Sequence, residues 1–285
     1  MKSALEWKRA ALLQSPLFTP LHPILANLDV GDFPTLHDCN ALLATHPSAI
    51  TVQNGKPVRF VPQQGGKLLF ADQYEPRCYL EGEVQMRANN WHDLFNALVW
   101  LTFPKTKAVL NARHYYALVD QMESGAAGRG TVRDVNTLFD ESGVIVAYAH
   151  QELAGLLRNF NWKELFWQRR EQVRPQSSRQ TMGFYLIGHG LYEKALQPYV
   201  GMTGQGLLLE VEEKFFSWLQ PQQLAHLDNL LAEYLAVPGH CRSTRELAPV
   251  PLLGLPGWAA GNERVEYYDN TDYFRSGRRN KAKRY

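Results

Sequence analysis

Residues 90–104 have the sequence NWHDLFNALVWLTFP, and this stretch decides the fold. Its apolar side chains lie on almost every face of a helix, so the pattern predicts a central, buried helix over residues 91–103. Asn90 can cap the first turn, with Asp93 three residues on as in a variant of the capping box. Pro104 ends this helix and can begin the next one, which we expect to stop near Ser124.

Upstream of this helix, Asn54-Gly55 separates two β-rich runs and predicts a hairpin. Both residues of a two-residue hairpin turn have a positive φ, a conformation that Asn and Gly adopt most readily. We therefore expect a positive φ at both positions, within an early antiparallel sheet over residues 50–86.

Downstream, residues 131–149 predict a second hairpin, with Glu141-Ser142-Gly143 as its turn. Residues 184–197 predict a helix in spite of two glycines. Residues 220–235 carry a leucine-rich stripe that predicts an amphipathic helix ended by Pro238-Gly239. Together these patterns indicate an α+β fold, a helix-rich single domain with a small antiparallel sheet or hairpins.

The two ends of the chain differ from its centre. Pro16, Pro20, Pro23 and Pro34 prevent any long regular element in residues 1–49. We interpret these residues as an arm that wraps the globular domain of residues 50–274. Residues 275–285 cannot build a core and predict a flexible basic tail. The cationic residues of this tail are Arg275, Arg278, Arg279, Lys281, Lys283 and Arg284.

The net charge of +2 at pH 7 is too small to attract a polyanion through the field of the whole protein. The expected contact for a polyanion is therefore the basic tail. Cys39, Cys78 and Cys241 form no CxxC pair, so we expect reduced thiols and a cytoplasmic location. The longest predominantly apolar run, residues 94–103, has ten residues, about half of the roughly 20 that span a bilayer. We therefore expect a soluble protein without membrane contact.

The stretch that begins at Asn90 resembles the signature block of an uncharacterised bacterial family named domain of unknown function 3025. Three later blocks are similar to that family as well, and the resemblance covers residues 74–274. These blocks have the sequences LFDESG at residues 138–143, GHGLYEK at residues 188–194 and LGLPGW at residues 253–258. The resemblance implies no activity, so the chemistry has to be inferred from the residues.

Three of the four blocks contain ionisable side chains of the kind that bind metal ions. The first holds His92, the second Asp140-Glu141, and the third His189 and Glu193, which share a helix face at i, i+4. Imidazoles and carboxylates bind divalent metal ions, and a bound ion lowers the pKa of a coordinated water. We expect His92, Asp140, His189 and Glu193 as metal ligands, and Asp140, Glu141 and His189 as catalytic residues, facing one pocket.

Each block also has a structural interpretation. Asp93 can bond backbone N–H groups at a helix start, and Asp140-Glu141 can serve the chemistry of a tight turn. His189 can be a core histidine, and its flanking glycines permit another backbone or a ligand to approach closely.

The leading functional hypothesis is a metal-assisted hydrolase that uses a divalent ion, with a phosphorylated substrate as one option. The alternative is a non-catalytic protein that associates with nucleic acid or the ribosome through the basic tail. Binding of that kind would weaken steeply with salt.

Overall fold

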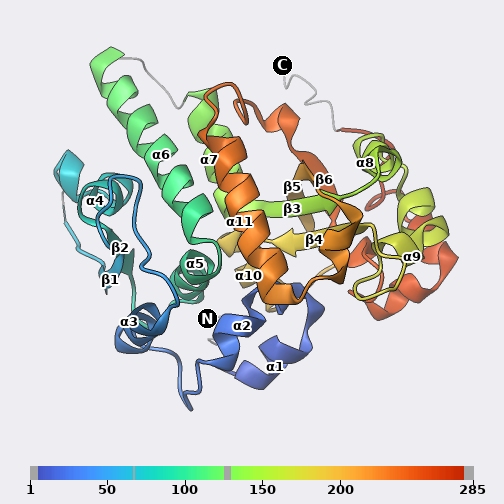
Figure 1. Ribbon diagram of the computed structural model, residues 1–285, viewed down its shortest axis with the longest axis horizontal. Helices are drawn as coiled ribbons and strands as arrows, with labels where there is room; N and C mark the ends of the chain where they lie inside the picture. The colour runs from blue at the N-terminus through green and yellow to red at the C-terminus, as the bar shows by residue number, and fades with distance from the viewer. Residues whose placement is uncertain (1–5, 67, 125–129, 279–285) are drawn as a thin grey trace.

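The computed structural model describes residues 6–66, 68–124 and 130–278. Its helices surround a two-stranded and a four-stranded sheet, so the predicted helix-rich α+β fold is confirmed. Figure 1 shows the smaller sheet on the left, with α5 and α6 between it and the larger sheet.

The predicted central helix is α5 (Trp91–Thr102). The side chain of Asn90 accepts a hydrogen bond from the backbone N–H of Asp93 (3.0 Å), and every residue from Asp93 to Leu101 is buried. Pro104 begins α6 (Pro104–Ser124), as predicted. The carboxylate of Asp228, on α11 (Gln220–Ala236), accepts hydrogen bonds from the backbone N–H groups of Lys105 and Thr106 in the first turn of α6.

The larger sheet has the strand order β4-β3-β5-β6. Its strands are β3 (Gly143–Tyr148), β4 (Met182–Leu186), β5 (Thr203–Glu210) and β6 (Ala248–Pro251). β3 pairs in parallel with β5, and the other two pairs are antiparallel. All six residues of β3 are buried. β4 and β5 pair with its two edges, and helices pack against it.

Two predictions for this region are wrong. Residues 131–149 form α7 (Thr131–Ser142) followed directly by β3, so no hairpin turn exists at Glu141-Ser142-Gly143. Residues 184–197 form β4 and then α10 (His189–Ala195) in place of one helix. In the first segment the buried Val135 and Phe139 have helical spacing, which the hairpin prediction overlooked. In the second, pairing of β4 with β3 favours a strand, which local patterns do not reveal.

The early sheet also differs from its prediction. β1 (Arg59–Pro62) pairs with β2 (Glu83–Met86) in parallel, because α4 (Tyr74–Glu81) carries the chain back between them. The predicted hairpin survives as a single antiparallel bridge between Thr51 and Pro57. Its loop has three residues, since Val52 N donates to Lys56 O, and only Gly55 has a positive φ (86°).

The N-terminal arm is part of the core. It forms the short helices α1 (Arg9–Gln14), α2 (His22–Ala26) and α3 (Leu36–Thr45). Between them, Phe18 stacks on Phe95 of α5 and Tyr192 of α10, with ring centroids 5.6 and 5.7 Å apart. The arm therefore helps to hold α5 against α10.

The remaining helices are α8 (Gln151–Arg158), α9 (Arg170–Val173) and α11 (Gln220–Ala236), the amphipathic helix that the sequence predicts. A π-helical turn, Glu164–Gln168, precedes α9. α11 packs on α6 and β3 and passes in front of the larger sheet in Figure 1. Within the described residues, no helix has both the length and the hydropathy that crossing a bilayer requires.

The described part of the basic tail contacts the folded domain. Trp162 Nε1 donates to Arg275 O (2.6 Å), and Arg278 Nη2 donates to the carbonyl oxygens of Arg245 and Leu247, both at 2.8 Å. Arg275 and Arg278 therefore belong to the body of the protein and not to a flexible segment. Arg279, Lys281, Lys283 and Arg284 lie outside the described residues.

The burial of α5 makes a testable prediction about stability. Leu98→Ala should lower the free energy of unfolding by about 2–5 kcal/mol, because Leu98 is fully buried and the shorter side chain leaves a cavity. Leu69→Ala is the matched control, since Leu69 is 77% exposed, and should change little. Urea denaturation of both variants measures the difference, and equal midpoints would refute the central position of α5.

Candidate functional site

An open pocket of about 400 Å³ lies where α5, α6, α7 and α10 meet the end of β2. Its lining is strongly polar, and it includes four of the five predicted site residues. The lining includes the side chains of Arg87, His92, Arg133, Thr137, Asp140, Glu141 and His189.

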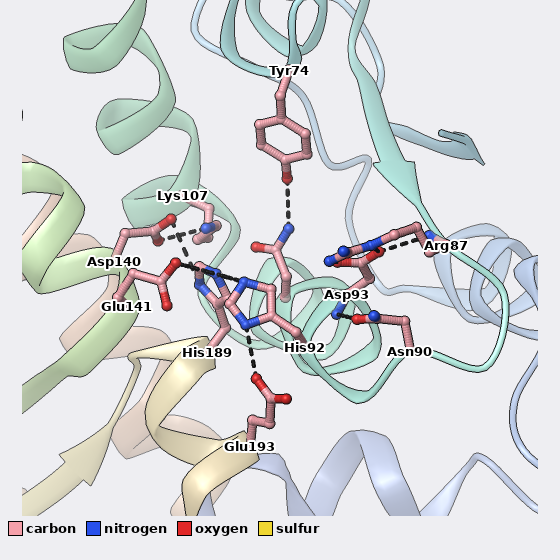
Figure 2. A network of polar contacts seen from close by, with 11 residues as sticks. Tyr74, Arg87, Asn90, His92, Asp93, Lys107, Asp140, Glu141, His189 and Glu193 are labelled. Atoms are coloured by element: carbon pink, nitrogen blue, oxygen red, sulfur yellow. Dashed lines mark hydrogen bonds and ion pairs between the residues drawn. The ribbon is translucent and has the colours of Figure 1, made fainter. Parts of the chain in front are cut away.

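The start of α5 positions His92. Asn90 caps the helix, and the carboxylate of Asp93 accepts two hydrogen bonds from the Arg87 guanidinium and one from its backbone N–H. Burial opposes ionisation of Asp93, but these bonds lower its pKa below the usual value. Asp93 is thus structural, and it fixes the helical turn that points His92 into the pocket (Figure 2).

Asp140 and Glu141 lie in the last turn of α7. Negative charge is unfavourable there, because the helix dipole places partial negative charge at the C-terminus. Their interpretation as turn residues is therefore wrong, and their position costs the helix stability. Nearby cationic groups have to compensate for this cost.

His189 is the first residue of α10, directly after Gly188. Gly188 N donates to Gly143 O (2.9 Å), and a Cβ on Gly188 would lie 2.6 Å from Ser142 N. Only glycine permits this backbone contact, as the sequence indicated. It brings the end of α7 against the start of α10, and a Cβ on Gly190 would overlap the Glu141 carboxylate.

The imidazoles of His92 and His189 meet at the centre of this arrangement (Figure 2). Their Nε2 atoms are 3.1 Å apart, and Glu141 Oε1 is 3.6 Å from each of them. Burial opposes ionisation of Glu141, but the neighbouring His189 and His92 lower the pKa of its carboxyl group.

A carboxylate faces the other nitrogen of each ring. His92 Nδ1 is 3.1 Å from Glu193 Oε2, and His189 Nδ1 is 3.7 Å from Asp140 Oδ2. An ionised carboxylate only accepts hydrogen bonds, so the contact with Glu193 favours hydrogen on Nδ1 of His92. His189 Nδ1 is buried without a hydrogen-bond partner, because 3.7 Å is too long for such a bond. The Nε2 atoms of both rings face the Glu141 oxygen.

Lys107 of α6 holds Asp140 in place. Its Nζ is 2.5 Å from Asp140 Oδ1, and its side chain is only 5% exposed. Burial opposes ionisation of Asp140, but Lys107 and His189 outweigh it and lower the pKa of the carboxyl group to about 2. Asp140 is therefore charged at neutral pH, and its Oδ2 lies beyond hydrogen-bond distance of His189 Nδ1.

The five predicted residues thus come together around the two imidazoles. His92, His189 and Glu141 supply the three converging atoms, all within 4.8 Å of one another. Asp140 and Glu193, which we expected as ligands, face the Nδ1 atoms instead. A carboxylate at that position is the usual outer partner of a metal-binding histidine.

Lys107 and Arg133 also belong to this site but were not among the predicted site residues. Lys107 interrupts the apolar face of a predicted helix, and a lysine at such a position needs a buried counter-ion. That signal was available. Arg133 lies four residues before Thr137 and eight before Glu141, a helical spacing that the wrong hairpin prediction concealed.

A model of one protein family, described as "Protein of unknown function (DUF3025)", matches residues 58–278. The match confirms the predicted resemblance and includes every residue of the site. No curated protein and no solved structure matches the chain.

The contact at Gly188 makes a prediction about folding. Gly188→Ala should lower the free energy of unfolding by about 2–4 kcal/mol, because its Cβ overlaps backbone atoms that cannot move aside. Gly155→Ala, on α8 with open space around its Cα, is the matched control and should be neutral or slightly stabilising. Chemical denaturation compares the two, and equal stabilities would show that α7 and α10 do not depend on this contact.

Proposed function

Since this chain belongs to the DUF3025 family of proteins of unknown function, its chemistry has to be inferred from its site, and we propose a metal-assisted hydrolase. One divalent ion binds to His92 Nε2, His189 Nε2 and Glu141 Oε1. The observation that carries the proposal is the convergence of these three possible ligand atoms, which all lie within 4.8 Å of one another. Two Nε2 atoms 3.1 Å apart need either a cation or a proton between them, and a metal ion would contact all three atoms at once.

The separations of the three atoms support a zinc-like ion. A point equidistant from atoms 3.1, 3.6 and 3.6 Å apart lies about 2.0 Å from each, in the range of Zn–N and Zn–O bonds. Two histidines and one glutamate are a ligand set found in zinc hydrolases.

Three protein ligands leave a fourth position for water on the pocket side. An ion held there by His92, His189 and Glu141 would lower the pKa of a bound water from about 15.7 to about 7 and so supply a nucleophile at neutral pH. Attack of that water's oxygen on a carbonyl or phosphoryl atom would break the bond to the leaving group, and the leaving group would take up the proton that the water gives up. Glu193 keeps the His92 imidazole oriented during these steps.

The substrate and the compartment are part of the proposal. A phosphorylated substrate would present its oxyanions to the metal ion. The charge of a divalent ion exceeds that of its one carboxylate ligand, Glu141, and so would attract these oxyanions. A cytoplasmic location agrees with Cys39, Cys78 and Cys241, which are buried and form no disulfide.

The alternative, nucleic-acid or ribosome association through the tail, stays a prediction. Two of its six cations, Arg275 and Arg278, already bond within the chain. This leaves Arg279, Lys281, Lys283 and Arg284 to contact a polyanion.

Metal content tests the proposal. The purified protein, loaded with zinc and then desalted, should hold about one ion per chain, and it should lose the ion in His92→Ala, His189→Ala and Glu141→Gln because each removes a ligand. Elemental analysis gives the stoichiometry. Hydrolysis of p-nitrophenyl phosphate and p-nitrophenyl acetate should stop on chelation and return with zinc.

His150→Ala is the matched control, because His150 also pairs with a carboxylate, Glu213 at 3.0 Å, but on the surface and away from the site. It should keep the ion. Absence of bound metal in the parent protein would overturn the proposal and assign the two imidazoles to a shared proton. Bound iron with consumption of oxygen would indicate oxygenase chemistry in place of hydrolysis.

A further inference from the structure

We infer that Arg133, which lines the same pocket about two helical turns before Glu141 on α7, binds an anionic group of the substrate. This inference rests on the proposed function and deepens it, because it assigns a second recognition point. The substrate then carries a carboxylate or a phosphate at a fixed distance from the bond that is hydrolysed.

The charges around the pocket support this assignment. Arg87 is neutralised by Asp93, which it contacts through two hydrogen bonds at 2.8 Å, and Lys107 is neutralised by Asp140. Arg133 lines the same pocket, and among the described residues no carboxylate pairs with it. A guanidinium without a counter-ion at a pocket wall is suited to bind an oxyanion.

A neutral partner orients Arg133. Its Nη1 donates to Gln121 Oε1 on α6, at 3.2 Å. This bond restrains the side chain but leaves its charge uncompensated. The remaining N–H groups of the guanidinium can then donate to a ligand.

The spacing along α7 gives the distance between the two recognition points. Arg133, Thr137 and Glu141 recur every four residues, so they share one face of the helix, and all three line the pocket. Eight residues of helix rise by about 12 Å. The pocket therefore suits an elongated ligand, with its metal-binding group at Glu141 and its anionic end near Arg133.

Dicarboxylic acid monohydroxamates test this arrangement, because the hydroxamate binds the metal and the acid lies at the far end. Suberic acid monohydroxamate has six methylene groups between its two ends and can reach along two turns of α7, whereas the succinic compound has only two and is too short. Calorimetry on the zinc-loaded protein compares each acid with its methyl ester. We expect the suberic acid to bind about tenfold more tightly than its ester, and the succinic pair to bind equally.

Arg133→Met should abolish the preference for the acid without changing zinc affinity, and Arg133→Lys should keep part of it. Arg179→Met, at an exposed arginine outside the pocket, is the matched control and should behave as the parent protein. A phosphonate-terminated analogue of the suberic compound distinguishes the two anions, since a phosphate site should favour it over the carboxylate.

Equal affinity of the suberic acid and its ester, or an unchanged preference in Arg133→Met, would overturn this inference while leaving the metal site intact. If the protein takes up no zinc, the proposed function is wrong, and the inference about Arg133 is wrong with it. Zinc uptake is therefore measured before the hydroxamates are added.

Discussion

The close contact between the backbones of Gly188 and residues 142–143 is the constraint on which the site depends. It brings the last turn of α7 to the first residue of α10, although the two helices are far apart in the chain. A side chain at Gly188 would separate them and move Glu141 away from His189. The buried helix α5 supplies the third wall, and Phe18 of the arm stacks on both α5 and α10. The hydrophobic core and the polar site are thus held by the same packing.

The site contains several features that lower stability, and each is compensated by another charge. Asp140 and Glu141 lie at the unfavourable end of a helix, and Lys107 is almost completely buried. Lys107 and Asp140 neutralise each other, and Glu141 lies 3.6 Å from both imidazoles, which are in hydrogen-bond contact with one another. Local costs concentrated at one pocket are typical of a functional site, where selection acts on chemistry and not on stability. A bound cation would contact both imidazoles and offset the charge of Glu141.

Local patterns in the sequence predicted three helices. The pattern of apolar residues predicted α5 and α11, and Pro104 marked the start of α6. They failed at residues 131–142, where the helical spacing of Val135 and Phe139 was overlooked, and at residues 184–186, where pairing with β3 sets a strand. The parallel pairing of β1 and β2 also depends on the intervening α4 and was not visible. For the site, residue types and glycines were sufficient to select His92, Glu141 and His189. The division between ligands and outer carboxylates was not predictable, because it depends on which ring nitrogen each carboxylate faces.

The central claim is that His92, His189 and Glu141 bind one divalent ion. The most direct measurement is a crystal structure of the zinc-loaded protein, with anomalous difference density collected on both sides of the zinc absorption edge. The account predicts one strong peak about 2.0–2.2 Å from His92 Nε2, His189 Nε2 and Glu141 Oε1, with Glu193 and Asp140 still facing the Nδ1 atoms. An ordered site without a peak, or a peak bound by Nδ1 atoms or by other residues, would contradict it.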